Sequence, residues 1–128
     1  MEKILLSNGV EIPQLGFGTF RITDGDTCKQ AVLCALKTGY RLIDTAQAYH
    51  NEEFVGEAIK ESGIPREEIF ITTKINFRNS DQAEEVMEES FRKLGVDYID
   101  LVLIHWPYNN YYHAWRVLEK LYKEGRIR

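Results

Sequence analysis

The sequence of 128 residues predicts an α/β fold, in which parallel β/α units follow a short N-terminal hairpin. Short apolar runs alternate strictly with amphipathic segments, so that four strands and four helices are expected. The fourth strand-like run, "YIDLVLIHW", is almost continuously apolar, as in a strand buried on both faces. Strict alternation implies right-handed crossovers and a parallel sheet. No linker or shift of composition divides the chain, and we therefore expect one domain over residues 1–128.

The first elements are a hairpin, a brief strand and a helix. In "ILLSNGVEI", two apolar runs flank an Asn-Gly pair, which suits a tight turn and predicts a hairpin at residues 3–12. "LGFGTF" predicts the brief strand that follows. Asp26 or Thr27 is expected to cap the next helix, which runs to Lys37, and Gly39 is expected to terminate it in a left-handed conformation.

Two further β/α units follow, each with a capping residue before its helix and a glycine after it. "YRLIDTA" predicts a strand, and Asn51 is expected to cap a helix that Gly63 ends. "EEIFITTKI" is rich in β-branched residues and predicts another strand. A long helix is then expected to start at Ser80 or Asp81 and to stop at Gly95.

The fourth strand, "YIDLVLIHW", precedes a final helix over about residues 113–123. The inward positions of this helix are expected to be Trp115, Leu118, Leu121 and Tyr122. After its glycine stop, Ile127 is interpreted as the first apolar residue of a fifth strand.

Charge and hydropathy exclude several classes of partner. Sixteen basic and twenty acidic side chains give a net charge of −4, which argues against a nucleic-acid surface. No apolar run approaches the roughly 20 residues that span a bilayer, and the N-terminus is too polar for a signal peptide. We expect no nucleic-acid or membrane partner and a cytoplasmic location.

Polar residues close three successive apolar strands. Asp44 directly follows "RLI", Lys74 directly follows "IFITT", and His105 directly follows "LVLI". In parallel α/β folds, function collects at the carboxyl ends of the strands, so these side chains should meet at one rim. Tyr49 follows Asp44 by five residues and should reach the same rim.

This set of side chains is suited to general acid catalysis. A nearby lysine ammonium stabilises a tyrosine phenolate, and an aspartate holds that ammonium charged and oriented. A neutral histidine can donate a hydrogen bond to a carbonyl oxygen. The tyrosine would then protonate a developing alkoxide. No group in the chain donates a hydride, so a carbonyl reduction would need a nicotinamide cofactor.

Several motifs resemble a known family. "GYRLIDTAQAY", "TTK" and "LIHWP" resemble the signatures of the aldo-keto reductases, and "LGFGTFRI" after a hairpin resembles their opening. These enzymes are (β/α)8 TIM barrels that use NADPH or NADH. A full barrel needs about 250 residues and eight strands. The resemblance therefore implies the N-terminal half of such a barrel, with the hairpin as its plug.

The resemblance also implies roles for the residues at the rim. It makes Tyr49 the general acid, Lys74 the residue that lowers its pKa, and Asp44 the completion of the charge network. His105 would orient the carbonyl group of the substrate.

Other positions would contact the cofactor and the substrate. By the same resemblance, Thr19 and Asp44 would lie near the nicotinamide ribose. The substrate pocket would be lined by Phe20, His105 and Trp106. In the family, most of the loops that grip the rest of the cofactor come from the second half of the barrel.

The expected function is NAD(P)H-dependent reduction of aldehydes or ketones to alcohols, with weak or no activity for this chain alone. Open strand edges lead us to expect self-association or pairing with a second half-barrel. The alternative is a truncated, non-catalytic remnant or interaction module. A metal-dependent hydrolase using Asp44 and His105 is a distant third, because the chain lacks paired histidines, and no metal site is expected.

Overall fold

A computed structural model describes the whole chain, Met1–Arg128. Strands β1 (Lys3–Leu5) and β2 (Glu11–Pro13) form an antiparallel hairpin. The main sheet contains β3 (Phe17–Gly18), β4 (Leu42–Asp44), β5 (Phe70–Ile75) and β6 (Leu101–Ile104). Its strands are parallel and lie in the order β3-β4-β5-β6, which confirms the predicted sheet and leaves β3 and β6 as its edges.

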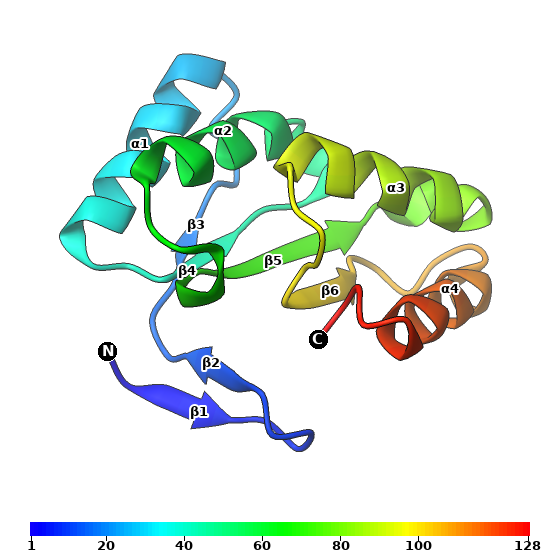
Figure 1. The fold of residues 1–128 in the computed structure, drawn as a ribbon. Helices are drawn as coiled ribbons and strands as arrows, with labels where there is room; N and C mark the ends of the chain where they lie inside the picture. Colours follow the sequence, from blue (N-terminus) through cyan, green and yellow to red (C-terminus); the bar gives the residue numbers. More distant parts are fainter.

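Four helices follow the four strands of this sheet, as predicted. They are α1 (Gly25–Thr38), α2 (Glu52–Ser62), α3 (Ala83–Leu94) and α4 (Tyr111–Lys123). In Figure 1, α1, α2 and α3 lie above the sheet, α4 lies beside β6, and the hairpin lies below. None of these helices combines the length and the apolar composition that a membrane crossing requires.

Three helices end at the glycines that the sequence predicts. Gly39, Gly63 and Gly95 follow α1, α2 and α3 with φ angles of 113°, 68° and 66°. Such positive φ values are accessible to glycine at little cost, and here they turn the chain toward the next strand.

The beginnings of two helices differ from the prediction. The N-cap of α1 is Asp24, not Asp26 or Thr27, because the Asp24 carboxylate accepts hydrogen bonds from the backbone N–H and the hydroxyl of Thr27. Helix α3 begins at Ala83 rather than at Ser80 or Asp81. The six residues before it, Phe77–Gln82, form a tighter 3₁₀ segment (η3) that is kinked at Asn79.

Helix α4 buries a different face from the one predicted. Its buried residues are Ala114, Val117, Leu118 and Leu121, whereas Trp115 and Tyr122 are exposed by 55% and 51%. The prediction was wrong for these two aromatic residues, because no further strand or helix covers them beside the edge strand β6. They line a groove of about 600 Å³ between the hairpin, β6 and α4.

The end of the chain runs beside the start of β6. Ile127 forms a parallel bridge with Ile99, supported by hydrogen bonds from the Ile99 N–H to Arg126 and from the Arg128 N–H to Ile99. Ile127 is only 8% exposed. Ile127 therefore pairs through a single isolated parallel bridge, as the first residue of a further strand would, but the structure forms no fifth strand there.

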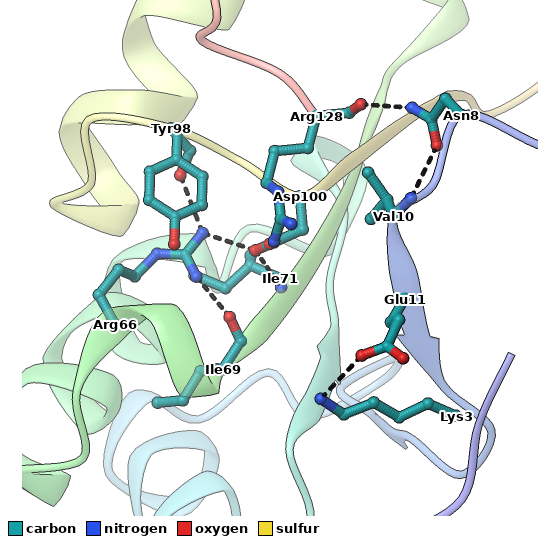
Figure 2. Close-up of polar contacts among 10 residues, drawn as sticks. All are labelled: Lys3, Asn8, Val10, Glu11, Arg66, Ile69, Ile71, Tyr98, Asp100 and Arg128. Atoms are coloured by element: carbon teal, nitrogen blue, oxygen red, sulfur yellow. Dashed lines mark hydrogen bonds and ion pairs between the residues drawn. The ribbon is translucent and has the colours of Figure 1, made fainter. Parts of the chain in front are cut away.

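A buried carboxylate ties this end of the sheet together, as Figure 2 shows. Asp100 accepts hydrogen bonds from Arg66 (2.7 Å), from the backbone N–H of Ile71 (2.9 Å) and from Arg128 (3.0 Å). The carbonyl oxygen of Arg128 in turn accepts from the side-chain amide of Asn8 in the hairpin turn, at 2.9 Å. The hairpin, two strands and the last residue thus share one polar network at the end of the sheet opposite the predicted rim.

Candidate active site

Lys74 is the centre of the side chains at the carboxyl ends of the strands. Its ammonium nitrogen lies 2.5 Å from Oδ1 of Asp44, 3.0 Å from the carbonyl oxygen of Thr45 and 3.3 Å from the hydroxyl of Tyr49. The Lys74 side chain is 12% exposed, so these charge-assisted contacts are largely shielded from water. The structure brings together the lysine, aspartate and tyrosine that the sequence analysis selected.

Tyr49 reaches this centre because only two residues separate the end of β4 from a 3₁₀ turn, η1 (Gln47–Tyr49). The ammonium of Lys74 lies 5.0 Å from the centroid of its ring. The ring of His105 meets it edge-on at 5.7 Å, and the ring of Phe20 lies 5.1 Å away on a tilted plane. The tyrosine ring therefore has one cation, one imidazole and one apolar ring as neighbours, and the cation contacts its hydroxyl.

His105 follows β6 directly, and its backbone N–H donates to the carbonyl oxygen of Ile75. Burial lowers the pKa of its imidazole, the Lys74 ammonium lowers it further, and Asp44 partly opposes them. An ordinary histidine has a pKa near 6.5, so His105 is neutral at pH 7. In that state it can donate one hydrogen bond to a carbonyl oxygen.

Aromatic side chains continue outward from the histidine. Trp106 stacks on His105 with ring centroids 6.4 Å apart, and Tyr108 stacks on Trp106 at 6.2 Å. Phe77 of η3 meets Tyr108 edge-on at 5.8 Å. Phe20 and Trp106 are exposed by 63% and 52%, so the rim presents open apolar faces beside the polar centre.

Thr19 lies next to Asp44 but does not face the open rim. It is fully buried, and both its backbone N–H and its hydroxyl donate to the carbonyl oxygen of Asp44, at 3.0 and 3.1 Å. That Thr19 and Asp44 lie near the nicotinamide ribose stays a prediction. The geometry makes Thr19 a support for the backbone of β4.

Two polar residues beneath the centre, the buried Asn51 and the half-buried Gln47, were not predicted as part of the site. Asn51, expected only as a helix cap, is 1% exposed and bonds to the segments around Thr19 and Thr45. Gln47 links η1 to Asn76 and Ser90 through hydrogen bonds of 3.0 Å each. The run of polar residues in "QAYHNEE", between a strand and a helix, could have indicated these roles. An ordinary solvent-exposed loop has the same polar composition, so the run does not distinguish the two.

Glu52 is a second buried polar residue in this region that was not predicted as part of the site. It is 4% exposed and accepts hydrogen bonds from the hydroxyls of Thr73 (2.9 Å) and Ser90 (3.3 Å). Burial raises the pKa of its carboxyl group, and the two hydroxyls partly offset that rise. Because Thr73 precedes Lys74, this carboxyl group supports β5 from the helix side of the sheet.

Metal-ligating residues do not gather here or elsewhere. Asp44 and His105, weighed above as ligands, have no third partner, and the chain holds no cluster of three or more His, Cys, Asp or Glu side chains that could share a metal ion.

Comparison with known proteins identifies what this arrangement resembles. The chain is 50% identical to glyoxal reductase of Bacillus subtilis over 132 residues, which cover 99% of this chain and 47% of that protein. It is 54% identical over 106 residues to glycerol 2-dehydrogenase (NADP(+)) of Saccharomyces cerevisiae, with 82% and 34% of the two chains covered. The chain thus spans about half the length, or less, of the curated relatives it matches.

Solved structures that resemble this chain are also reductases, of which it covers about half. An aldo/keto reductase from Brucella melitensis superposes with a TM-score of 0.95 at 44% identity, over 98% of this chain and 51% of that one. An aldo-keto reductase of Bombyx mori, in complex with NADP, superposes with a TM-score of 0.90 at 36% identity, over 99% and 48%. The predicted half of a TIM barrel is thereby confirmed. The model of the aldo/keto reductase family matches residues 14–128, and the chain belongs to that family.

Proposed function

We propose that this chain carries the proton-donating centre of an NAD(P)H-dependent reductase that converts aldehydes or ketones to alcohols. The single observation that carries this proposal is the position of Lys74, whose ammonium contacts both the Asp44 carboxylate and the Tyr49 hydroxyl. That geometry is suited to a tyrosine acting as a general acid.

The proton transfer follows from these contacts. Tyr49 gives its hydroxyl proton to the carbonyl oxygen of the substrate as that oxygen gains electron density. The ammonium of Lys74, 3.3 Å away, stabilises the resulting phenolate, and Asp44 holds the ammonium in place. His105, which is neutral, donates a hydrogen bond that orients the same carbonyl oxygen.

The residues of this chain fit the reacting end of a nicotinamide cofactor. The Asp44 side chain is 33% exposed and uses Oδ1 for Lys74, which leaves its second oxygen to accept from a ribose hydroxyl. When bound, NADPH or NADH supplies the hydride that the carbonyl carbon receives. The open faces of Phe20 and Trp106 would line the space for the substrate. Two relatives support NADP(H), one by its name and one by its bound ligand.

Affinity for the cofactor is expected to be low in the isolated chain. The residues described above would contact only the reacting end of the cofactor, and affinity grows with the number of well-placed contacts. Titration of NADPH, followed by nicotinamide fluorescence, measures this directly.

The test of the proposed function is Tyr49→Phe. In a preparation that oxidises NADPH with a simple aldehyde, this change should lower turnover by about 100-fold or more, because it removes only the proton donor. Tyr122→Phe, in an exposed tyrosine of α4, is the matched control and should leave turnover unchanged. Equal turnover in Tyr49→Phe and the unaltered chain would refute the assignment of the general acid.

A second candidate function, an interaction module that associates with a second copy or with another half-barrel, is favoured by a different observation. The edge strands β3 and β6 have backbone groups that no neighbouring strand pairs. Leu103 of β6 is 41% exposed, since it alternates with residues that face the helices. Absence of NADPH binding would favour this candidate over the first.

A further inference from the structure

Asn51 stands at the N-cap position of α2 but does not cap the helix. Its backbone has φ −132° and ψ 8°, and its side chain makes no hydrogen bond to the first N–H groups of α2. Glu52 and Glu53, in the first turn, supply the negative charge that favours this end of a helix. The Asn51 side chain is buried, so its polar atoms need partners elsewhere in the protein.

All of its partners lie in the loops that surround the candidate active site. Oδ1 accepts from the hydroxyl of Thr45 at 2.7 Å and lies 3.3 Å from the hydroxyl of Thr19, whose single hydrogen it shares with the carbonyl oxygen of Asp44. Nδ2 donates to the carbonyl oxygens of Thr19 at 3.0 Å and Ile22 at 3.1 Å. Both donor hydrogens and the acceptor oxygen are therefore in use.

The two loops that this amide joins carry groups of the proton-donating centre. The carbonyl oxygen of Thr45 accepts from the Lys74 ammonium at 3.0 Å. The loop Thr19–Ile22 carries Phe20, whose ring lies 5.1 Å from the ring of Tyr49. One buried side chain thus fixes the carbonyl group below the lysine and the loop beside the tyrosine.

We propose that Asn51 is a positioning residue of the reductase site. It holds the Thr45 carbonyl group where the Lys74 ammonium can contact both that oxygen and the Tyr49 hydroxyl. The inference rests on the proposed function, and it goes beyond it because Asn51 itself touches none of the reacting atoms. A purely structural role would lower stability without changing the surroundings of Tyr49.

Two substitutions separate these roles. Asn51→Asp keeps the shape and the acceptor for Thr45 but turns a carboxylate oxygen toward two carbonyl oxygens. Thr45→Val removes only the hydroxyl that donates at 2.7 Å, and it serves if the first variant does not fold. Thr45→Ser keeps that hydroxyl and is the conservative control.

Asn8→Asp is the matched control for the first substitution. Like Asn51, Asn8 donates to a backbone carbonyl oxygen, that of Arg128, and accepts once through Oδ1. It lies in the hairpin turn, far from the strand ends that carry the candidate site.

The direct readout is ¹³C NMR of the chain labelled at tyrosine Cζ, with the Tyr49 signal identified by its loss in Tyr49→Phe. We expect Asn51→Asp and Thr45→Val to shift this signal, because the hydroxyl loses its fixed ammonium neighbour. Thr45→Ser and Asn8→Asp should leave it in place. An unshifted Tyr49 signal in a folded Asn51→Asp or Thr45→Val variant would overturn the proposal.

Kinetics give a second, independent readout. We expect the two disruptive variants to lower kcat by about 10-fold or more while the KM for the aldehyde stays within about twofold, because only the positioning of the proton donor changes. A raised KM with unchanged kcat would overturn the proposal. If the unaltered chain shows no turnover, as low affinity for the cofactor would produce, the NMR comparison decides alone, since it requires no cofactor. The proposed function fails separately, through equal turnover in Tyr49→Phe and the unaltered chain.

Discussion

The imidazole of His105 takes its properties from two neighbours and from its burial. Lys74 lowers the pKa of the imidazole and Asp44 raises it, so the two charges of the centre oppose each other at this ring. The neutral form of His105 is therefore coupled to the same ion pair that holds Tyr49.

This coupling predicts a pH dependence. Because the pKa of His105 is lowered in the folded protein, its contribution to stability is present above about pH 6.5 and is lost as the pH falls below the unfolded value. The Cε1 proton of His105, followed by ¹H NMR, should titrate at a lower pH than a free histidine. Lys74→Met should move its midpoint upward, since the ammonium is removed. Lys123→Met, in the last turn of α4, should not move it, and an unchanged midpoint in Lys74→Met would contradict the prediction.

Individual positions were predictable where a residue type coincided with a strand end. Asp44, Lys74 and His105 each close an apolar run, and the parallel sheet then brings them to one rim. The role of Asn51 was not predictable in the same way. An asparagine before a helix favours a cap, and only the packing of the loops around Thr19 and Thr45 turns its side chain away from the helix.

At the scale of elements, α2 and α3 meet at Gly56. A Cβ atom at this position would lie 2.6 Å from the carbonyl oxygens of Lys93 and Leu94 in the last turn of α3. Both are backbone atoms, which cannot rotate away. The absence of a side chain at Gly56 therefore sets how closely the two helices approach.

Gly56→Ala should consequently destabilise the protein. Alanine normally stabilises a helix relative to glycine by up to about 1 kcal/mol, but overpacking here should outweigh it and leave a net loss of about 1–3 kcal/mol. Urea unfolding measures the difference. Gly18→Ala is the control, because a Cβ atom there meets nothing within 4 Å. Equal stability of Gly56→Ala and the unaltered chain would show that the helices can separate.

The ends of helices were easier to predict than their beginnings. Glycines that follow an apolar pattern mark the ends of α1, α2 and α3, and they adopt the expected left-handed conformation. Several residues near each beginning are capable of capping, and the choice among them depends on tertiary contacts. The 3₁₀ segment η3 replaces the expected first turn of α3, and the side-chain amide of Asn109 after β6 donates to its Phe77 carbonyl oxygen.

At the scale of the whole molecule, unpaired strand edges and exposed aromatic residues coincide. Trp115 and Tyr122 line the groove beside β6, and Leu103 is exposed on the strand itself. The sequence pattern of α4 marked both aromatic residues as buried, as they would be if a further element covered that side. The spacing of apolar residues in a helix indicates which face is suited to burial. It does not indicate whether another strand or helix is present to cover that face.

These surfaces predict self-association at micromolar concentration. Sedimentation velocity or light scattering should detect species larger than the monomer, because pairing covers apolar surface and satisfies edge backbone groups. Leu103→Lys should weaken the association by placing a charge on β6. Leu5→Lys, at an exposed leucine of β1, should affect it less. A stable monomer under these conditions would contradict the prediction.

The bridge between Ile127 and Ile99 has a consequence for any strand that joins β6. Side chains alternate between the two faces of a sheet, so a shift by one residue would exchange the buried Ile127 with an arginine on either side of it. The bridge between Ile127 and Ile99 therefore fixes the register of any strand pairing that extends from it. Because the loop between these two residues is already closed, pairing of adjacent residues would cost little further loop-closure entropy.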